Sequence, residues 1–76
     1  MNALEPYNEK NHAQNINNIS INSISSLTKL LTEMEGQLSD EEYKILKRGI
    51  GIVIGELQIR VLNFIYQQYP ELSDID

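Results

Sequence analysis

The sequence predicts an all-α protein whose two helices form an antiparallel hairpin. From about residue 15 onward, apolar residues recur at intervals of three and four, which is the period of an amphipathic helix. This pattern is interrupted once, where Gly36 and then Ser39-Asp40 mark the end of one helix and the start of another. The chain has 76 residues and no cysteine. It is therefore one domain at most, and no disulfide or cysteine-bound metal stabilises it.

Residues 1–14 are expected to form a disordered or loosely docked arm. They contain Pro6, several asparagines and charges of both signs, but few apolar side chains that would pack in a core. His12, the only histidine, lies in this arm with no second ligand or catalytic partner near it in the sequence. We therefore expect its side chain to be solvated.

The first helix is expected at about residues 16–35, at the start of a hairpin domain that spans residues 15–69. Its apolar residues share one face at about 100° per residue; they are Ile16, Ile19, Ile24, Leu27, Leu30, Leu31 and Met34. Ser20 lies on the same stripe, which permits close packing at that end. Gly36 is expected to end the helix, because glycine adopts the left-handed conformation at little cost.

The second helix is expected at about residues 40–68. Ser39 and Glu42 have the spacing of a capping box, in which each side chain accepts a hydrogen bond from the other residue's backbone N–H. Pro70 ends the helix, because the residue before a proline disfavours the α conformation. Residues 49–55 alternate like a β-strand, but no second strand is available to pair with them within the chain, so a helix is favoured.

The second helix is apolar on two opposite faces. One broad face suits packing on the first helix and comprises Tyr43, Leu46, Ile50, Val53, Ile54, Leu57, Val61, Phe64 and Ile65. The other repeats every seven residues, with interleaved positions, and comprises Ile45, Ile52, Gly55, Ile59, Leu62, Tyr66 and Tyr69. A helix with two apolar faces is buried at the centre of an assembly. We therefore expect the second set to be the interface of a homodimer.

The helix lengths lead to the same expectation. At about 1.5 Å per residue, the second helix is about 43 Å long and the first about 30 Å. The second helix would then project beyond the first from about Val61 onward, with apolar side chains in water. Another copy of the chain is the simplest cover. Two hairpins would form a dimeric four-helix bundle with the second helix at its centre.

Composition excludes several classes of function. Eleven acidic and six basic residues leave a formal charge of −5, which disfavours binding to nucleic acid and to anionic membranes. No signal peptide or uncharged apolar run of about 20 residues is present, so we expect a cytoplasmic protein without a membrane segment. Glu56 and Arg60 are spaced for an ordinary helical ion pair. With no further catalytic group, ligand cluster or phosphate loop, we expect no enzyme activity, cofactor or metal.

The remaining expectation is a small, non-enzymatic protein–protein interaction module that acts as a homodimer. It would be regulatory, or inhibitor- or immunity-like, and its acidic surface would bind a basic protein partner. Lys44, Lys47 and Arg48 form the only basic cluster and are the candidate partner contact. The acidic tail, residues 70–76, is expected either to bind such a partner as a short motif or to fold back over the end of the second helix.

A set of residues over about half of the chain has the spacing of a known family. These residues are Ile24, Leu27, Leu31, Leu38, Ser39, Asp40, Glu42, Glu56, Leu57 and Leu62. They look like those of small enterobacterial modulators of the haemolysin-expression (Hha) type. That resemblance implies a DNA-associated modulator of gene expression that binds a nucleoid-structuring partner, with Lys44, Lys47 and Arg48 as its basic patch. The chain departs from the family at Gly49 and Gly51, where the family has charged residues, and it has no counterpart of the family's first helix.

Overall fold

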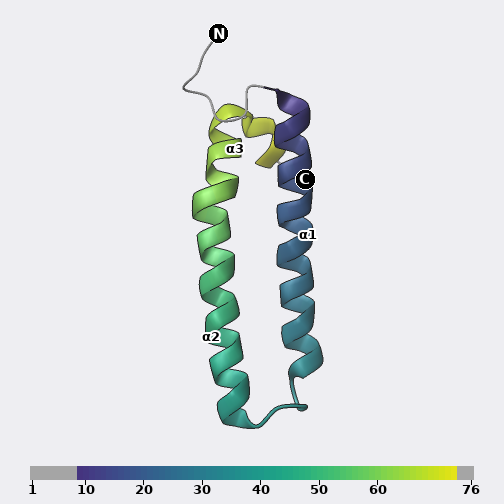
Figure 1. The fold of residues 1–76 in the computed structure, drawn as a ribbon, viewed down its shortest axis with the longest axis vertical. Coiled ribbons are helices and arrows are strands. Elements are labelled where there is room, and N and C mark those ends of the chain that lie inside the picture. The colour runs from purple at the N-terminus through teal and green to yellow at the C-terminus, as the bar shows by residue number, and fades with distance from the viewer. Residues whose placement is uncertain (1–8, 74–76) are drawn as a thin grey trace.

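The structure is a computed structural model that describes residues 9–73, and these form a long antiparallel hairpin (Figure 1). α1 comprises Lys10–Met34 and α2 comprises Asp40–Leu57. The described part of the chain contains no β-strand. The all-α fold and the helical conformation of residues 49–55 are therefore confirmed.

The second arm of the hairpin, residues 40–68, starts with α2 and continues beyond it without a break. A π-helical turn, η1 (Gln58–Leu62), leads directly into α3 (Asn63–Gln68). A short 3-10 turn, η2 (Pro70–Ser73), then brings the chain back beside the first turns of α1 (Figure 1). The expected second helix over residues 40–68 is thus present, and its end before Pro70 is confirmed.

The turn between the two arms forms as the sequence predicted. Ser39 Oγ accepts a hydrogen bond from the Glu42 N–H at 3.1 Å, and the Ser39 N–H donates to Glu42 Oε1 at 3.0 Å. This capping box contributes about 1 kcal/mol to helix stability. Gly36 adopts φ +85°, the left-handed conformation that follows the end of α1. Each signal is local, which is why both could be identified from the sequence.

The start of the first helix differs from the prediction. The sequence predicted an arm over residues 1–14, whereas α1 begins at Lys10; residues 1–8 lie outside the described part of the chain. Ala13 is fully buried in a cluster with Leu62 and Ile65. Its small side chain lets the two helices approach closely, and packing therefore extends the helix into a segment with little apolar character of its own.

The longer first helix removes the reason to expect a projecting end. α1 lies beside α2, η1 and α3 along the whole hairpin (Figure 1). Ile65 is fully buried and Leu62 is 4% exposed within the single chain. The prediction that the end of the second helix projects beyond the first is therefore wrong, because the first turns of α1 cover it. It no longer gives a reason to require another chain.

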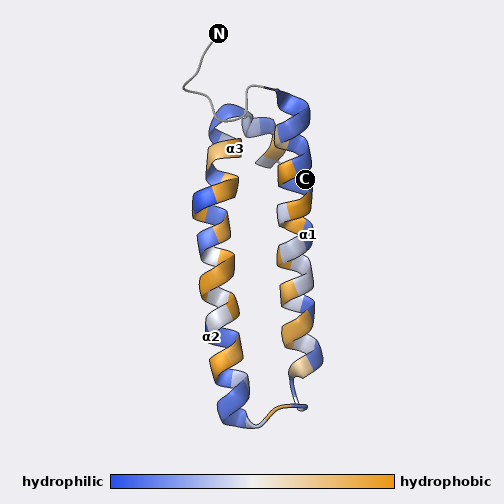
Figure 2. Cartoon of the chain, viewed as in Figure 1, coloured by the Kyte–Doolittle hydropathy of each residue, from blue (hydrophilic) through white to orange (hydrophobic). Residues whose placement is uncertain are grey.

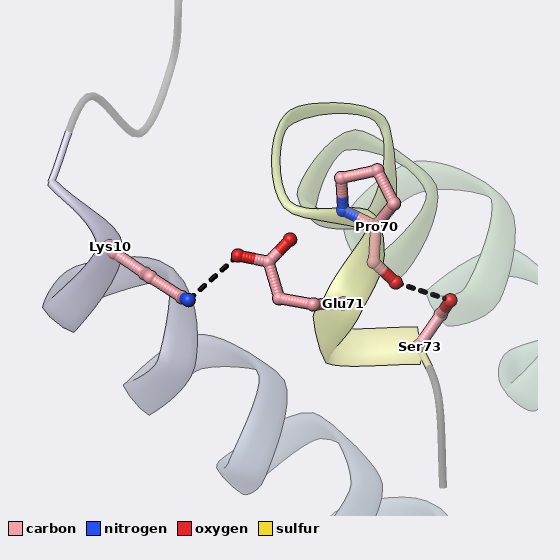
Figure 3. A network of polar contacts seen from close by, with 4 residues as sticks. All are labelled: Lys10, Pro70, Glu71 and Ser73. Carbon is pink, nitrogen blue, oxygen red and sulfur yellow. Dashed lines mark hydrogen bonds and ion pairs between the residues drawn. The ribbon is translucent and has the colours of Figure 1, made fainter.

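The described part of the acidic tail folds back onto the hairpin. Leu72 packs against the buried cluster beside Tyr66 and Tyr69. Lys10 Nζ and Glu71 Oε2 form an ion pair at 2.7 Å between α1 and η2 (Figure 3). These contacts close the open end of the hairpin. The remainder of the tail lies outside the described residues.

The π-helical turn changes which residues of the second arm face α1. A π turn contains one residue more than an α-helical turn, so it rotates everything after it by about one residue, roughly 100°. Leu62, Tyr66 and Tyr69, which the sequence placed on the outer face, consequently belong to the intrachain core. Phe64, which the sequence placed on the inner face, is 50% exposed.

Candidate functional site: an exposed apolar stripe on the second helix

The most unusual feature of the surface is a row of exposed isoleucines on the side of the second arm away from α1. Ile45, Ile52 and Ile59 are 68%, 58% and 64% exposed. Ile45 and Ile52, seven residues apart in regular α-helix, point in directions that differ by about 20°. Ile59 follows Ile52 by a further seven residues and lies in the π turn. We call these three residues the α2 stripe. Figure 2 shows repeated apolar bands (orange) along α2.

Two further large apolar side chains extend this surface. Val53 is 54% exposed beside Ile52, and Phe64 is 50% exposed beyond the π turn. Single exposed apolar residues are ordinary, but five large ones on one arm of a small domain are typical of an interface. The second arm therefore has one face that α1 covers and a second that no residue between 9 and 73 covers.

Glycines keep the backbone accessible beside the stripe. Gly49 and Gly55 lie three residues on either side of Ile52, and a Cβ at either position would meet no atom within 4 Å. Neither glycine is therefore required by packing within the chain. Because these glycines have no side chains, the backbone beside Ile52 is uncovered, and another helix backbone can approach it closely.

Charged residues border the stripe. Arg60 Nε donates to Glu56 Oε1, so the expected ion pair between these two residues is present on the exposed face. Lys44, Lys47 and Arg48 are all exposed, and none of them forms an ion pair with another described residue. They follow the acidic first turn of α2, so the second helix begins with a negative segment and continues with a positive one.

A separate shallow cleft lies beside the π turn. Its volume is about 440 Å³, and its lining residues are Ile21, Ile24, Ser25, Gln58, Leu62, Asn63, Tyr66 and Ser73. None of these is an acid, a base or a histidine. The Tyr66 hydroxyl is engaged in a 2.8 Å hydrogen bond to Asn17 Oδ1 across the two arms. The cleft thus presents amides, hydroxyls and aliphatic groups, without a pair of groups for acid–base catalysis.

The described residues also contain no group of three His, Asp or Glu side chains that would hold a metal ion. His12 is exposed in the first turn of α1, with Nε2 3.4 Å from Glu9 Oε1. The first described turns of α1 therefore place the histidine on the surface, beside one carboxylate.

The structure divides the seven interface residues that the sequence proposed. Ile45, Ile52 and Ile59 face outward, and Gly55 is half-exposed beside them. Leu62, at the end of the π turn, and Tyr66 and Tyr69 beyond it are packed within the chain. Sequence reasoning missed the exposure of Val53 and Phe64. For Phe64 the sequence did contain a signal. In the adjacent pairs Val61-Leu62 and Ile65-Tyr66 either residue can take the buried position, so the pattern also fits a helical phase in which Phe64 faces outward.

The second arm also has the dimensions of a membrane span. As one helix of 29 residues, Asp40–Gln68 is long and apolar enough to cross a bilayer, and 17% of its most apolar window is buried within the chain. The sequence did not lead us to expect this, because its uncharged apolar runs are shorter than a bilayer span. The finding rests on length and composition, which core helices of soluble proteins also satisfy.

Comparisons with protein-family models, with curated proteins and with solved structures found no match to this chain. Its function is therefore argued from the surface described above.

Proposed function

We propose that this protein is a non-enzymatic interaction module that self-associates through the α2 stripe. Two hairpins would pair through their second arms and form a four-helix assembly with α2 at the centre and α1 outside. The observation that carries the proposal is the α2 stripe itself, three isoleucines at intervals of seven residues along the second arm, each more than half exposed. Burying such side chains is the main source of association free energy.

The size of the surface indicates a reversible association. Fully burying one isoleucine contributes about 1.5–3 kcal/mol, but association also costs translational and rotational freedom. A contact along one helix belongs at the small end of protein interfaces, below about 1,200 Å² in total. We therefore expect a dimer that dissociates on dilution.

A second copy suits the stripe better than a lipid bilayer does. To cross a bilayer, the second arm would have to separate from α1, which would break the hydrogen bond between Tyr66 and Asn17 and leave the apolar face of α1, including Ala13, exposed to water. To lie on a bilayer surface, the stripe would bring Glu56 and a chain of net charge −5 to the headgroups. A copy of the chain buries the isoleucines and leaves the hairpin intact.

The proposal is tested by replacing one residue of the stripe. Ile52→Glu is expected to yield monomers in analytical ultracentrifugation at concentrations where the unchanged chain sediments as a dimer, because it places two carboxylates in the contact. Its helix content should change little, because the side chain is 58% exposed in the single chain. Ile19→Glu is the matched control: Ile19 is also 58% exposed, but lies on α1, and this variant should still dimerise.

Three outcomes would overturn the proposal. The unchanged chain would remain monomeric at all concentrations tested, Ile52→Glu would dimerise normally, or both glutamate variants would weaken the dimer equally. Flotation with phosphatidylcholine vesicles tests the alternative. Binding of the unchanged chain that Ile52→Glu abolishes, without a dimer in solution, would identify the stripe as a lipid-binding surface instead.

A further inference from the structure

We infer that two copies pair through α2 in antiparallel orientation, about a two-fold axis at Ile52. This inference rests on the proposed function and specifies its partner and geometry. The α2 stripe is symmetric about its centre, since Ile45 and Ile59 are each seven residues from Ile52. In an antiparallel pair, Ile52 therefore meets its own copy, and Ile45 of each chain meets Ile59 of the other.

The apolar pattern alone would also fit a parallel pair, and the charges decide between the two. In a parallel pair, the acidic first turn of α2, which contains Asp40, Glu41 and Glu42, would lie beside its own copy. The basic segment that contains Lys44, Lys47 and Arg48 would do the same. Two like-charged contacts of this kind are costly. In the antiparallel pair, the acidic turn lies level with Asn63 and Phe64, which are uncharged.

Antiparallel pairing also brings opposite charges together near the centre of the contact. Arg48 and Glu56 are each four residues from Ile52, so Arg48 of one chain is level with Glu56 of the other. At 100° per residue, both lie only about 40° from the direction of Ile52, close enough for long side chains to reach across. Lys44 is level with Arg60 of the other chain, but it lies about 80° from the direction of Ile52, on the flank opposite Arg60.

The two open glycines fit the same symmetry. Gly49 and Gly55 are each three residues from Ile52, and both have open space around them in the single chain. In the antiparallel pair they are level with each other and border the central isoleucines. Helix axes with small residues at the contact approach to about 8 Å. The turn around Ile52 is thus where the two helices would lie closest.

Disulfide trapping tests the orientation, and the chain is suited to it because it contains no cysteine. Ile45→Cys and Ile59→Cys are prepared separately, one with a tag that separates the two on a gel, and are oxidised with diamide alone and after mixing. Cysteines pair when their Cα atoms are within about 7 Å. In the antiparallel pair, positions 45 and 59 of the two chains meet, whereas two copies of position 45 are about 21 Å apart.

We expect the mixture to form the mixed dimer as the predominant product, and each variant alone to remain mostly monomeric on the gel. Lys29→Cys, at an exposed position of α1, gives the background from random collisions. Ile52 is retained in both variants, and circular dichroism verifies that each is folded.

The outcomes separate this inference from the proposed function. Efficient trapping of Ile45→Cys alone and of Ile59→Cys alone would show a parallel dimer and overturn the inference. A chain that sediments as a dimer, but is trapped in none of these combinations, would overturn it as well. A chain that shows no dimer in sedimentation contradicts the proposed function itself, before orientation is considered.

Discussion

At the scale of single residues, two exposed carboxylates at opposite ends of the hairpin are held in their charged form. The backbone N–H and the hydroxyl of Ser39 both hydrogen-bond around Glu42, and they lower the pKa of its carboxyl below the ordinary 4.5. The hydrogen bond from Lys10 lowers the pKa of the Glu71 carboxyl in the same direction. The Glu42 contact caps α2 and the Glu71 contact joins η2 to α1, so protonation of the two carboxyls weakens both ends of the fold.

These pKa shifts predict a loss of stability in acid. A carboxyl whose pKa is lower in the folded state stabilises the fold above its unfolded pKa, and this contribution is lost as the pH falls through the folded pKa. The free energy of unfolding should therefore decrease below about pH 4.5. Glu42→Gln and Glu71→Gln should each flatten that decrease, which urea denaturation at a series of pH values measures. If a variant with both substitutions lost stability in acid as steeply as the unchanged chain, the contacts of Glu42 and Glu71 would not contribute to the acid sensitivity.

At the scale of the elements, the π turn decides which face of the second arm is buried. Before η1, the residues that face α1 follow the α-helical period through Leu57. From Leu62, the last residue of η1, the face that packs on α1 continues through Ile65 and Tyr69. These residues are one position out of phase with the earlier period. The hydrogen bond between Tyr66 and Asn17 fixes the new phase, because it ties α3 to a buried position of α1.

Deleting Arg60 should convert the π turn to an ordinary α-helical turn without disturbing the core. Leu62 then follows Leu57 by four positions, the spacing of one α-helical face, and the residues beyond keep their orientation. The cost is the exposed pair with Glu56, about 0.5 kcal/mol. The thermal midpoint, followed by circular dichroism, should therefore remain near that of the unchanged chain.

The matched control is deletion of Arg48, which is also exposed but lies in regular α-helix. It rotates Ile50, Ile54 and Leu57 by about 100° relative to the first turns of α2 and should lower the thermal midpoint strongly. Equal losses in the two deletion variants would show that the π turn does not carry the extra residue.

At the scale of the whole molecule, one alanine packs the first turns of α1 against the last turns of the second arm. Ala13 is fully buried in the cluster that includes Leu62 and Ile65, and Leu72 of η2 packs against the same cluster. Most other side chains are at least partly exposed, as expected of a hairpin with extents of 53 × 23 × 17 Å. This end of the molecule therefore contains most of the buried core.

Ala13→Asp should destabilise the chain by about 3 kcal/mol or more, because it places an unpaired charge in that cluster. Asn15→Asp adds the same charge two residues away at an exposed position of α1 and should have little effect. Urea denaturation of the two variants measures the difference. Similar stabilities would mean that the first turns of α1 do not pack on the second arm in solution.

Local features were readable from the sequence because they depend on a few neighbouring residues. The Ser39–Glu42 capping box, the left-handed Gly36, the end of the helix before Pro70 and the helical period all follow from backbone geometry and short-range hydrogen bonds. They were sufficient to predict two helices in an antiparallel hairpin and the outward orientation of Ile45, Ile52 and Ile59.

The tertiary structure alone decided where α1 begins and which way the last turns of the second arm face. Ala13 has too little apolar surface to signal burial, and it becomes a core residue only because Leu62 and Ile65 lie opposite. Likewise, the adjacent apolar pair Val61-Leu62 fits either helical phase, and contact with α1 selects one through the π turn. Both choices depend on residues about 50 positions apart in the chain, a separation that no local pattern encodes.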